Sequence, residues 1–117
     1  MKNIHTHTDG DEVRIAISGG FVFSIHKLFR DSYRNKRPEM RYTVDLSAVS
    51  HLDSSALGML LLLREHAGGE ASDVAIINCA PKIEKLLEIA QFNRLFQIQA
   101  RRWEPQVREE ETSSQAE

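Results

Sequence analysis

The sequence predicts a single α/β domain with a mixed, mostly parallel central sheet and helices packed on it. Strand-like and helix-like segments alternate along the chain, and most successive strands are separated by one helix, an arrangement that forces parallel pairing. A chain of 117 residues with 41% hydrophobic side chains can form one core but not two. The expected order is β-β-α-β-α-β-α-β, with the domain at residues 1–103 and a disordered acidic tail at 104–117.

The first two strands are expected to form a hairpin. Residues 12–17, EVRIAI, alternate apolar side chains with polar or small ones, which is typical of a half-buried strand. Residues 2–7 are expected to pair with them through a turn at Asp9-Gly10. Gly19-Gly20 is then expected to break the chain.

A helix is predicted next, because apolar residues recur at helical spacing over residues 23–35. Ser24 is its expected N-cap, and Pro38 prevents its continuation. Residues 42–47, YTVDLS, are short and rich in β-branched side chains, which favours a strand. A loop is expected over residues 48–52.

The C-terminal half repeats the alternation of helix and strand. Residues 54–67 predict a largely buried helix that ends at Gly68-Gly69, because its middle is apolar almost all round. Residues 73–77, DVAII, predict a strand. Pro81 fits the first position of a helix that runs to about residue 91, and a last short strand follows at 96–98.

Composition excludes several classes of function. The net charge is −2 and the small basic clusters carry no interleaved aromatic side chains, so we expect no nucleic-acid binding. The single cysteine, Cys79, rules out an internal disulfide and fits a reducing compartment. The N-terminus lacks the apolar core of a signal peptide, and the longest apolar run is far below the roughly 18 residues of a membrane span. A soluble cytoplasmic protein is expected.

The stretch HLDSSALG, residues 51–58, is the main candidate site. It lies between a predicted parallel strand and the start of a predicted helix, and binding sites of open α/β sheets gather at that edge. Asp53 can cap the helix by accepting from the N–H of Ser55 or Ala56. Two interpretations of Ser54 stay open. It is either first-turn filler, or an exposed hydroxyl that accepts a phosphate and so gains roughly −1.5 to −2 charges.

These residues resemble a known family. The segment Asp45-Leu46-Ser47, then Leu52, then Asp53-Ser54-Ser55-Ala56-Leu57-Gly58 is similar to the central motif of STAS domains, the anti-sigma factor antagonists. The stretches Asn78-Cys79-Ala80-Pro81 and Ile89 to Phe96 also fit, and the element order agrees over residues 10–100.

The resemblance implies a regulatory binding module without catalysis or cofactor. Ser54 stands where the family is phosphorylated by a partner that is both anti-sigma factor and serine kinase, and a serine phosphatase commonly reverses the step. The unphosphorylated form binds the partner and thereby regulates transcription. The runner-up is a structural STAS subunit, for example of a lipid-transport or signalling complex, with no phosphate cycle.

Two positions depart from the family pattern. Ala56 replaces a common glycine, and alanine favours the helix more than glycine does. Many members also carry an acidic residue after the second strand, where this chain has Phe21-Val22-Phe23. These three apolar residues either contact a partner, together with His51, or fill the core.

Other chemistry has little support in the pattern. His5 and His7 share one strand face but lack a third metal ligand, so no metal is expected. His51, Asp53 and Ser54 have the residue types of a hydrolase triad, but close neighbours on one tight loop do not easily adopt its geometry. Cys79 follows a predicted buried strand and is expected to be inert. We therefore expect no enzyme.

Overall fold

The computed structural model describes residues 3–100, which form a five-stranded sheet in the order β1-β2-β3-β4-β5. The strands are β1 (Ile4–Asp9), β2 (Glu12–Phe21), β3 (Arg41–Leu52), β4 (Val74–Cys79) and β5 (Gln97–Ala100). The α-helices are α1 (His26–Asp31), α2 (Ser54–His66) and α3 (Pro81–Ile89), with short 3-10 turns at Phe23–Ile25, Gly69–Ala71 and Phe92–Arg94. Pairing of β1 with β2 is antiparallel, and the other three pairings are parallel. The predicted class and element order are confirmed.

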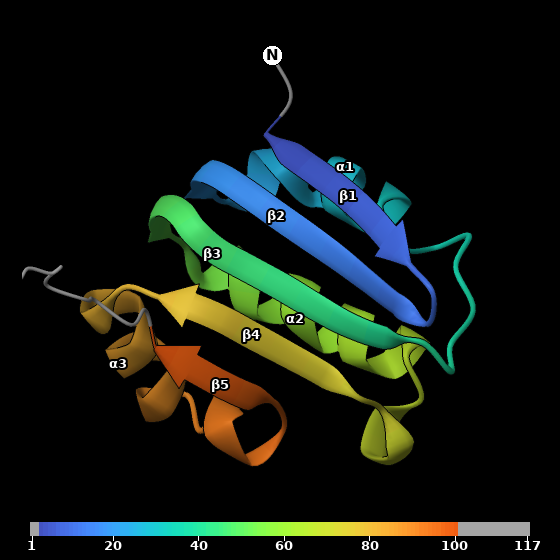
Figure 1. The fold of residues 1–117 in the computed structure, drawn as a ribbon. Coiled ribbons are helices and arrows are strands. Elements are labelled where there is room, and N and C mark those ends of the chain that lie inside the picture. The colour runs from blue at the N-terminus through green and yellow to red at the C-terminus, as the bar shows by residue number, and fades with distance from the viewer. Residues whose placement is uncertain (1–2, 101–117) are drawn as a thin grey trace, which may run out of the picture.

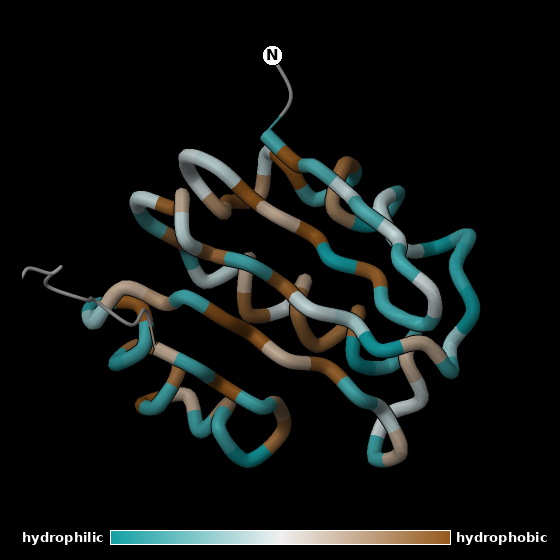
Figure 2. The backbone as a smooth tube through the Cα atoms, in the orientation of Figure 1, coloured by the Kyte–Doolittle hydropathy of each residue, from teal (hydrophilic) through white to brown (hydrophobic). Residues whose placement is uncertain are grey.

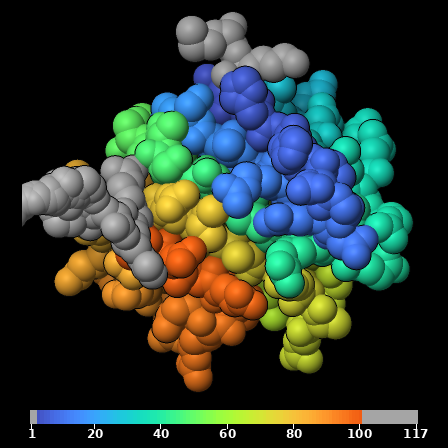
Figure 3. Space-filling view, in the orientation of Figure 1, coloured from blue at the N-terminus to red at the C-terminus, as the bar shows by residue number. Residues whose placement is uncertain are grey.

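The helices cover only one face of the sheet, as Figure 1 shows from the uncovered side. The core lies between the sheet and the helices, where side chains such as Ile15, Val44, Leu60 and Leu63 are fully buried. Hydrophobic and hydrophilic residues alternate along β2 (Figure 2), because successive side chains of a strand point to opposite faces. Side chains of the strands themselves make up the uncovered face (Figure 3).

The expected break at Gly19-Gly20 is wrong. Strand β2 continues through both glycines to Phe21, and its register against β3 shifts between Ala16 and Ser18 and again between Gly19 and Gly20. Gly19 has φ +78°, a value that glycine reaches without steric cost. The glycines therefore let the strand shift its register without ending.

The expected loop at residues 48–52 is also strand. Because β2 is longer than predicted, it offers a pairing partner to β3 as far as Leu52. Strand β4 pairs with β3 only from Tyr42 to Asp45. The last residues of β3 thus diverge from β4 while they stay attached to β2.

The first helical segment is shorter than residues 23–35 and has no Ser24 cap. It begins with a 3-10 turn whose flanking residue is Val22, and no side chain of that residue caps it. The backbone N–H of Phe23 instead donates to the carboxylate of Asp53, thirty positions away. A residue so remote in sequence supplies the acceptor that a local serine was expected to supply.

Helix α2 begins and ends as predicted but is not buried all round. Asp53 is its N-cap, and Gly68 (φ +118°) and Gly69 (φ +62°) follow its end in left-handed conformations. Leu61 and Leu62 are exposed. None of the helices within residues 3–100 is long and apolar enough to cross a membrane. The predicted domain end at residue 103, the 104–117 tail and Trp103 lie outside the described residues.

Candidate functional site

Asp53 joins two segments at the edge of the sheet where the parallel strands end. Its Oδ1 accepts from the backbone N–H of Ser55 at 2.9 Å and of Ala56 at 3.3 Å, as expected for an N-cap. Its Oδ2 accepts from the N–H of Phe23 at 3.3 Å, and its own N–H donates to the carbonyl of Phe21 at 3.3 Å. One carboxylate thus holds both the start of α2 and the loop that follows β2.

Ser54 is the accessible serine of the motif. It is the first residue of α2 and is exposed, whereas Ser55 is half-buried. Among residues 3–100 its hydroxyl has no hydrogen-bond partner. Ala56 is fully buried, which accounts for a small residue there, and Gly58 is exposed. Capping therefore explains Asp53, and packing explains Ala56, but neither explains Ser54.

An apolar groove of about 270 Å³ opens beside Ser54. Helix α2 contributes Leu57 to its wall, and α3 contributes Leu86 and Ile89. Leu86 and Ile89 are 42% and 70% exposed, so the wall that they form is open to water. Leu52, Asp53 and Ala90 complete the lining. The candidate hydroxyl therefore lies at the rim of an apolar surface that water covers in the free domain.

The trio after β2 divides between core and surface. Phe21 is fully buried and packs against Phe29 at 5.2 Å between ring centroids, so it belongs to the core and cannot contact a partner. Val22 is half-buried. Phe23 is 60% exposed and stacks on the His26 ring, with centroids 4.4 Å apart and planes inclined by 11°. Its N–H bond to Asp53 ties this exposed aromatic side chain to the start of α2.

His51 is exposed and lies over the Gly20 backbone. A Cβ added at Gly20 would come within 2.9 Å of the His51 ring, so the glycine leaves the space that the ring occupies. The His51 Nδ1 lies 3.0 Å from the Ser50 hydroxyl. The structure therefore pairs His51 with Ser50, and the imidazole is not oriented by Asp53 as a hydrolase triad requires.

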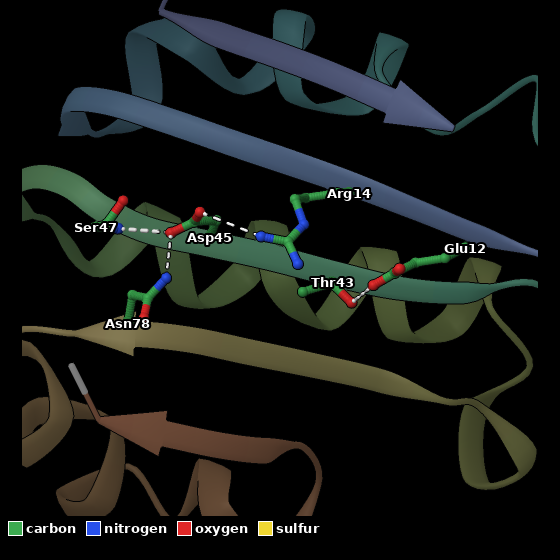
Figure 4. Close-up of polar contacts among 6 residues, drawn as sticks. All are labelled: Glu12, Arg14, Thr43, Asp45, Ser47 and Asn78. Carbon is green, nitrogen blue, oxygen red and sulfur yellow. Dashed lines mark hydrogen bonds and ion pairs between the residues drawn. The ribbon is translucent and has the colours of Figure 1, made fainter. Parts of the chain in front are cut away.

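A polar network on the uncovered face links three strands (Figure 4). Asp45 Oδ1 accepts from the Ser47 N–H at 2.9 Å and from Asn78 Nδ2 at 3.1 Å, and Oδ2 lies 3.7 Å from an Arg14 nitrogen. Burial raises the pKa of the Asp45 carboxyl, but the bonds from Ser47 and Asn78 and the Arg14 charge outweigh it and hold the pKa below its ordinary value.

Asp45 and Asn78 stand where β3 and β4 separate. Asp45 is the last residue of β3 that pairs with β4, and Asn78 has a left-handed φ of +61°. Their hydrogen bond joins the two strands at the point where they diverge. In the sequence Asp45 and Asn78 stand out only as parts of a motif, because they are 33 residues apart and no local pattern places them in contact.

The remaining candidates are not brought together. His5 and His7 lie exposed on the edge strand β1, and within the described chain no three metal-binding side chains converge. Burial, aided by the Glu84 charge, raises the pKa of the Cys79 thiol to about 11, so at neutral pH it is a protonated, buried group.

Solved structures share this fold. A candidate anti-sigma factor antagonist from Thermotoga maritima matches with a TM-score of 0.72 at 20% identity, over 82% of this chain and 85% of that one. The anti-sigma factor antagonist SpoIIAA in its unphosphorylated form gives 0.69 at 14% identity, over 81% and 86%. The phosphorylated form of the Bacillus SpoIIAA gives 0.65 at 14% identity, over 81% and 89%. The fold is that of a SpoIIAA-like α/β domain.

The family follows from the sequence match. The family described as "Mlab, STAS domain" matches residues 4–98, and this chain belongs to the STAS domain family. The STAS-domain containing protein PA14_20770 of Pseudomonas aeruginosa (strain UCBPP-PA14) is 52% identical over 91 residues, which cover 77% of this chain and 90% of that protein. The resemblance seen in the DLS and DSSALG motifs is confirmed.

Proposed function

We propose that the protein is an anti-sigma factor antagonist that is switched off by phosphorylation of Ser54. In this proposal it acts in the cytoplasm and binds an anti-sigma factor that is also a serine kinase, and a serine phosphatase restores the binding form. The observation that carries the proposal is an exposed, unbonded Ser54 hydroxyl at the start of α2, on the rim of an apolar groove.

The chemistry of the switch belongs to the partner. The Ser54 hydroxyl oxygen bonds to the γ-phosphorus of ATP held by the kinase, the bond to ADP breaks, and the hydroxyl proton leaves to a base of the kinase. This domain contributes only the acceptor hydroxyl and the capped helix start that presents it.

The geometry around Asp53 explains how a phosphate would act. A phosphate at a helix N-terminus is ordinarily held by free backbone N–H groups. Here the N–H groups of Ser55 and Ala56 already donate to the Asp53 carboxylate. That carboxylate also repels a second anion, so the phosphate is directed outward, where it adds about −1.5 to −2 charges to the docking surface. Binding is lost without unfolding.

Intact-mass measurement after incubation with ATP and a partner kinase tests the proposal. We expect one added phosphate on the wild-type protein and on Ser55→Ala, the matched control at the neighbouring serine, and none on Ser54→Ala. We also expect Ser54→Asp to weaken partner binding while Ser54→Ala retains it. Equal binding by these two variants, or phosphate on Ser55 instead, contradicts the switch.

A second candidate is a structural STAS subunit of a transport or signalling complex. It is favoured by the description of the matching family, which names Mlab and not an anti-sigma factor antagonist. Such a subunit would use the same groove without a phosphate cycle. Stable co-purification with a transporter ATPase, together with partner binding that is unaffected by Ser54→Asp, would distinguish it from the switch.

A further inference from the structure

Strand β1 forms a long outer edge of the sheet (Figure 1). On its inner side it pairs with β2 from Ile4 to Asp9 without a register shift. Natural sheets protect their edges with proline, lysine, a bulge or a very short strand. Residues 4–9, IHTHTD, contain none of the first three, whereas the opposite edge strand, β5, has only 4 residues and a register shift against β4. Among the described residues, β1 therefore offers the longer and less protected edge.

The backbone groups that face this edge follow from the pairing on the other side. The Ser18 N–H donates to the Asn3 carbonyl oxygen at 2.9 Å, so Asn3 bonds toward β2. In an antiparallel pair only alternate residues bond to the neighbouring strand. The N–H and C=O groups of Ile4, Thr6 and Thr8 therefore point away from β2, and no other strand within residues 3–100 pairs with them. These groups can bond to one further strand.

The helix-covered side of the same edge carries an apolar hollow of about 180 Å³. Its lining residues are Ile4, Thr6, Leu28, Asp31 and Ser32. Leu28 is 49% exposed although it borders the buried Ile4. Asp31 already has a counter-ion, because Arg34 lies 3.5 Å from it. A strand that pairs with β1 would extend the sheet beside this hollow, and its own side chains would cover Leu28.

We propose that the β1 edges of two copies of this chain pair antiparallel about a two-fold axis at Thr6, so that the two sheets become one. This register pairs Ile4 with Thr8 of the second copy and Thr6 with its own counterpart, and it uses every outward N–H and C=O group of β1. An axis at His5 or at His7 would leave Thr8 or Ile4 without a partner in β1. A two-fold interface joins one patch to itself, which is the commonest arrangement among homo-oligomers.

The side chains of β1 are compatible with self-pairing in this register. His5 and His7 project from the uncovered face, because the residues that alternate with them face the helices. His5 of one copy would lie opposite His7 of the second, with about 4.5–5.5 Å between their Cβ atoms, and aromatic rings at this distance stabilise a strand pair. Asp9, the one carboxylate of β1, would lie opposite Asn3 and not opposite a second carboxylate. The strand thus complements its own sequence, which favours a second copy over an unrelated strand.

Sedimentation velocity of the full-length protein over a concentration series tests the pairing. A small interface dissociates on dilution, so the wild-type protein is expected to pass from monomer to dimer as its concentration rises. Thr6→Pro should weaken dimerisation about tenfold, because each copy loses the N–H that donates across the axis. Pairing of β1 with β2 does not use this N–H, so the edge strand tolerates the proline. Thr6→Val is the matched control, because it keeps the N–H and the side-chain shape.

A second pair of variants tests the hollow. Leu28→Ser should weaken dimerisation several-fold, because Leu28 is expected to lose its exposed surface in the dimer. Leu62→Ser is the matched control and should leave dimerisation unchanged, since Leu62 is a 61% exposed leucine of α2 that does not line the hollow. Far-UV circular dichroism checks that every variant is folded.

Disulfide trapping tests the register itself. A mixture of His5→Cys and His7→Cys proteins should form an intermolecular disulfide on mild oxidation, because positions 5 and 7 of the two copies face each other at about the separation that a disulfide needs. Either variant alone should cross-link slowly, since its two equivalent positions lie on a diagonal of roughly 7–8 Å. Cys79 is buried and present in every sample, so its contribution is the same in all of them.

A wild-type protein that stays monomeric over the whole concentration series overturns the inference. A dimer that Thr6→Pro leaves unchanged also overturns it, as does cross-linking that is as fast in the separate variants as in the mixture. The outcome is independent of the phosphorylation switch, because no residue of β1 lines the groove beside Ser54.

Discussion

Replacing Asp53 by alanine should destabilise the domain at two places at once. The substitution removes the acceptor for the N–H groups of Ser55 and Ala56 at the start of α2. It also removes the acceptor for the N–H of Phe23 in the loop after β2. Most N-cap substitutions disturb one helix, whereas this one releases two segments that are thirty residues apart.

The magnitude follows from these contacts. Loss of an N-cap costs about 1 kcal/mol, loss of a negative charge at a helix N-terminus costs about 0.5 kcal/mol, and loss of the Phe23 hydrogen bond costs about 0.5 kcal/mol. Together they lower the free energy of unfolding by about 2 kcal/mol. Asp53→Asn keeps one capping oxygen but loses the charge and turns an amide N–H toward Phe23, so about half of the loss is expected.

Urea unfolding followed by far-UV circular dichroism measures these differences. Asp31→Ala is the matched control, because Asp31 is a half-exposed aspartate whose ion pair with Arg34 joins two surface side chains. Its loss should change the free energy of unfolding by less than about 0.5 kcal/mol. If Asp53→Ala is no less stable than Asp31→Ala, the role assigned to the Asp53 carboxylate is refuted.

Three further outcomes are expected. Leu60→Ala should lower the free energy of unfolding by about 2–5 kcal/mol in urea titrations, because Leu60 is fully buried. Leu62→Ala should change the same free energy by less than about 0.5 kcal/mol, because Leu62 is exposed. Similar values for the two variants would refute the assignment of Leu60 to the buried face of α2 and of Leu62 to the exposed face. Because the pKa of Asp45 is lowered on folding, its stabilisation is present above the unfolded pKa of about 3.9 and is lost as pH falls through the folded value. The stability gap between wild type and Asp45→Asn should therefore narrow between about pH 5 and pH 3, and a constant gap would contradict the network. Because the pKa of the Cys79 thiol is about 11, Cys79 should resist iodoacetamide at pH 8 in the folded protein and react once the protein is unfolded in urea. If the folded protein is alkylated as fast as the unfolded protein, the thiol is accessible and its assigned burial is wrong.

The sequence predicts the fold well wherever local signals are sufficient. The Asp9-Gly10 hairpin, the Asp53 cap, the Gly68-Gly69 stop and Pro81 at a helix start each depend on conformations that only a few residue types favour. The structure has all four features. The order of strands and helices followed from the change of hydrophobic period along the chain.

The errors come from contacts between distant residues. Gly19-Gly20 has the composition of a break, but pairing with β3 keeps it in a strand, and the same pairing turns residues 48–52 into strand. Ser24 has the composition of a cap, but the carboxylate of Asp53 takes that role from across the sheet edge. Exposure of Leu61 and Leu62 depends on which neighbours α2 has, and hydrophobicity alone does not report this.

The candidate site was predicted in its chemistry but not in its surroundings. The DSSALG motif located Ser54, because a serine without a capping or packing role stands out at a helix start. The groove wall formed by Leu86 and Ile89 comes from a helix some thirty residues later, and no local pattern places it beside Ser54. Phe21 is buried because β2 extends as far as this residue, whereas Phe23 lies beyond the strand in a 3-10 turn and is exposed.

The divergence of β3 from β4 gives one strand two different rates of amide hydrogen exchange. Up to Asp45 the strand has a neighbour on both sides, so its amides should exchange only when the sheet opens as a whole. Beyond Asp45, within residues 3–100, only β2 pairs with it, and alternate amides of residues 48–52 point away from that neighbour. These amides should exchange through small local openings, even at temperatures where the first half is fully protected. Ser54 follows this loosely held half directly, so the backbone that carries the proposed switch can adjust to an incoming partner without disturbing the core.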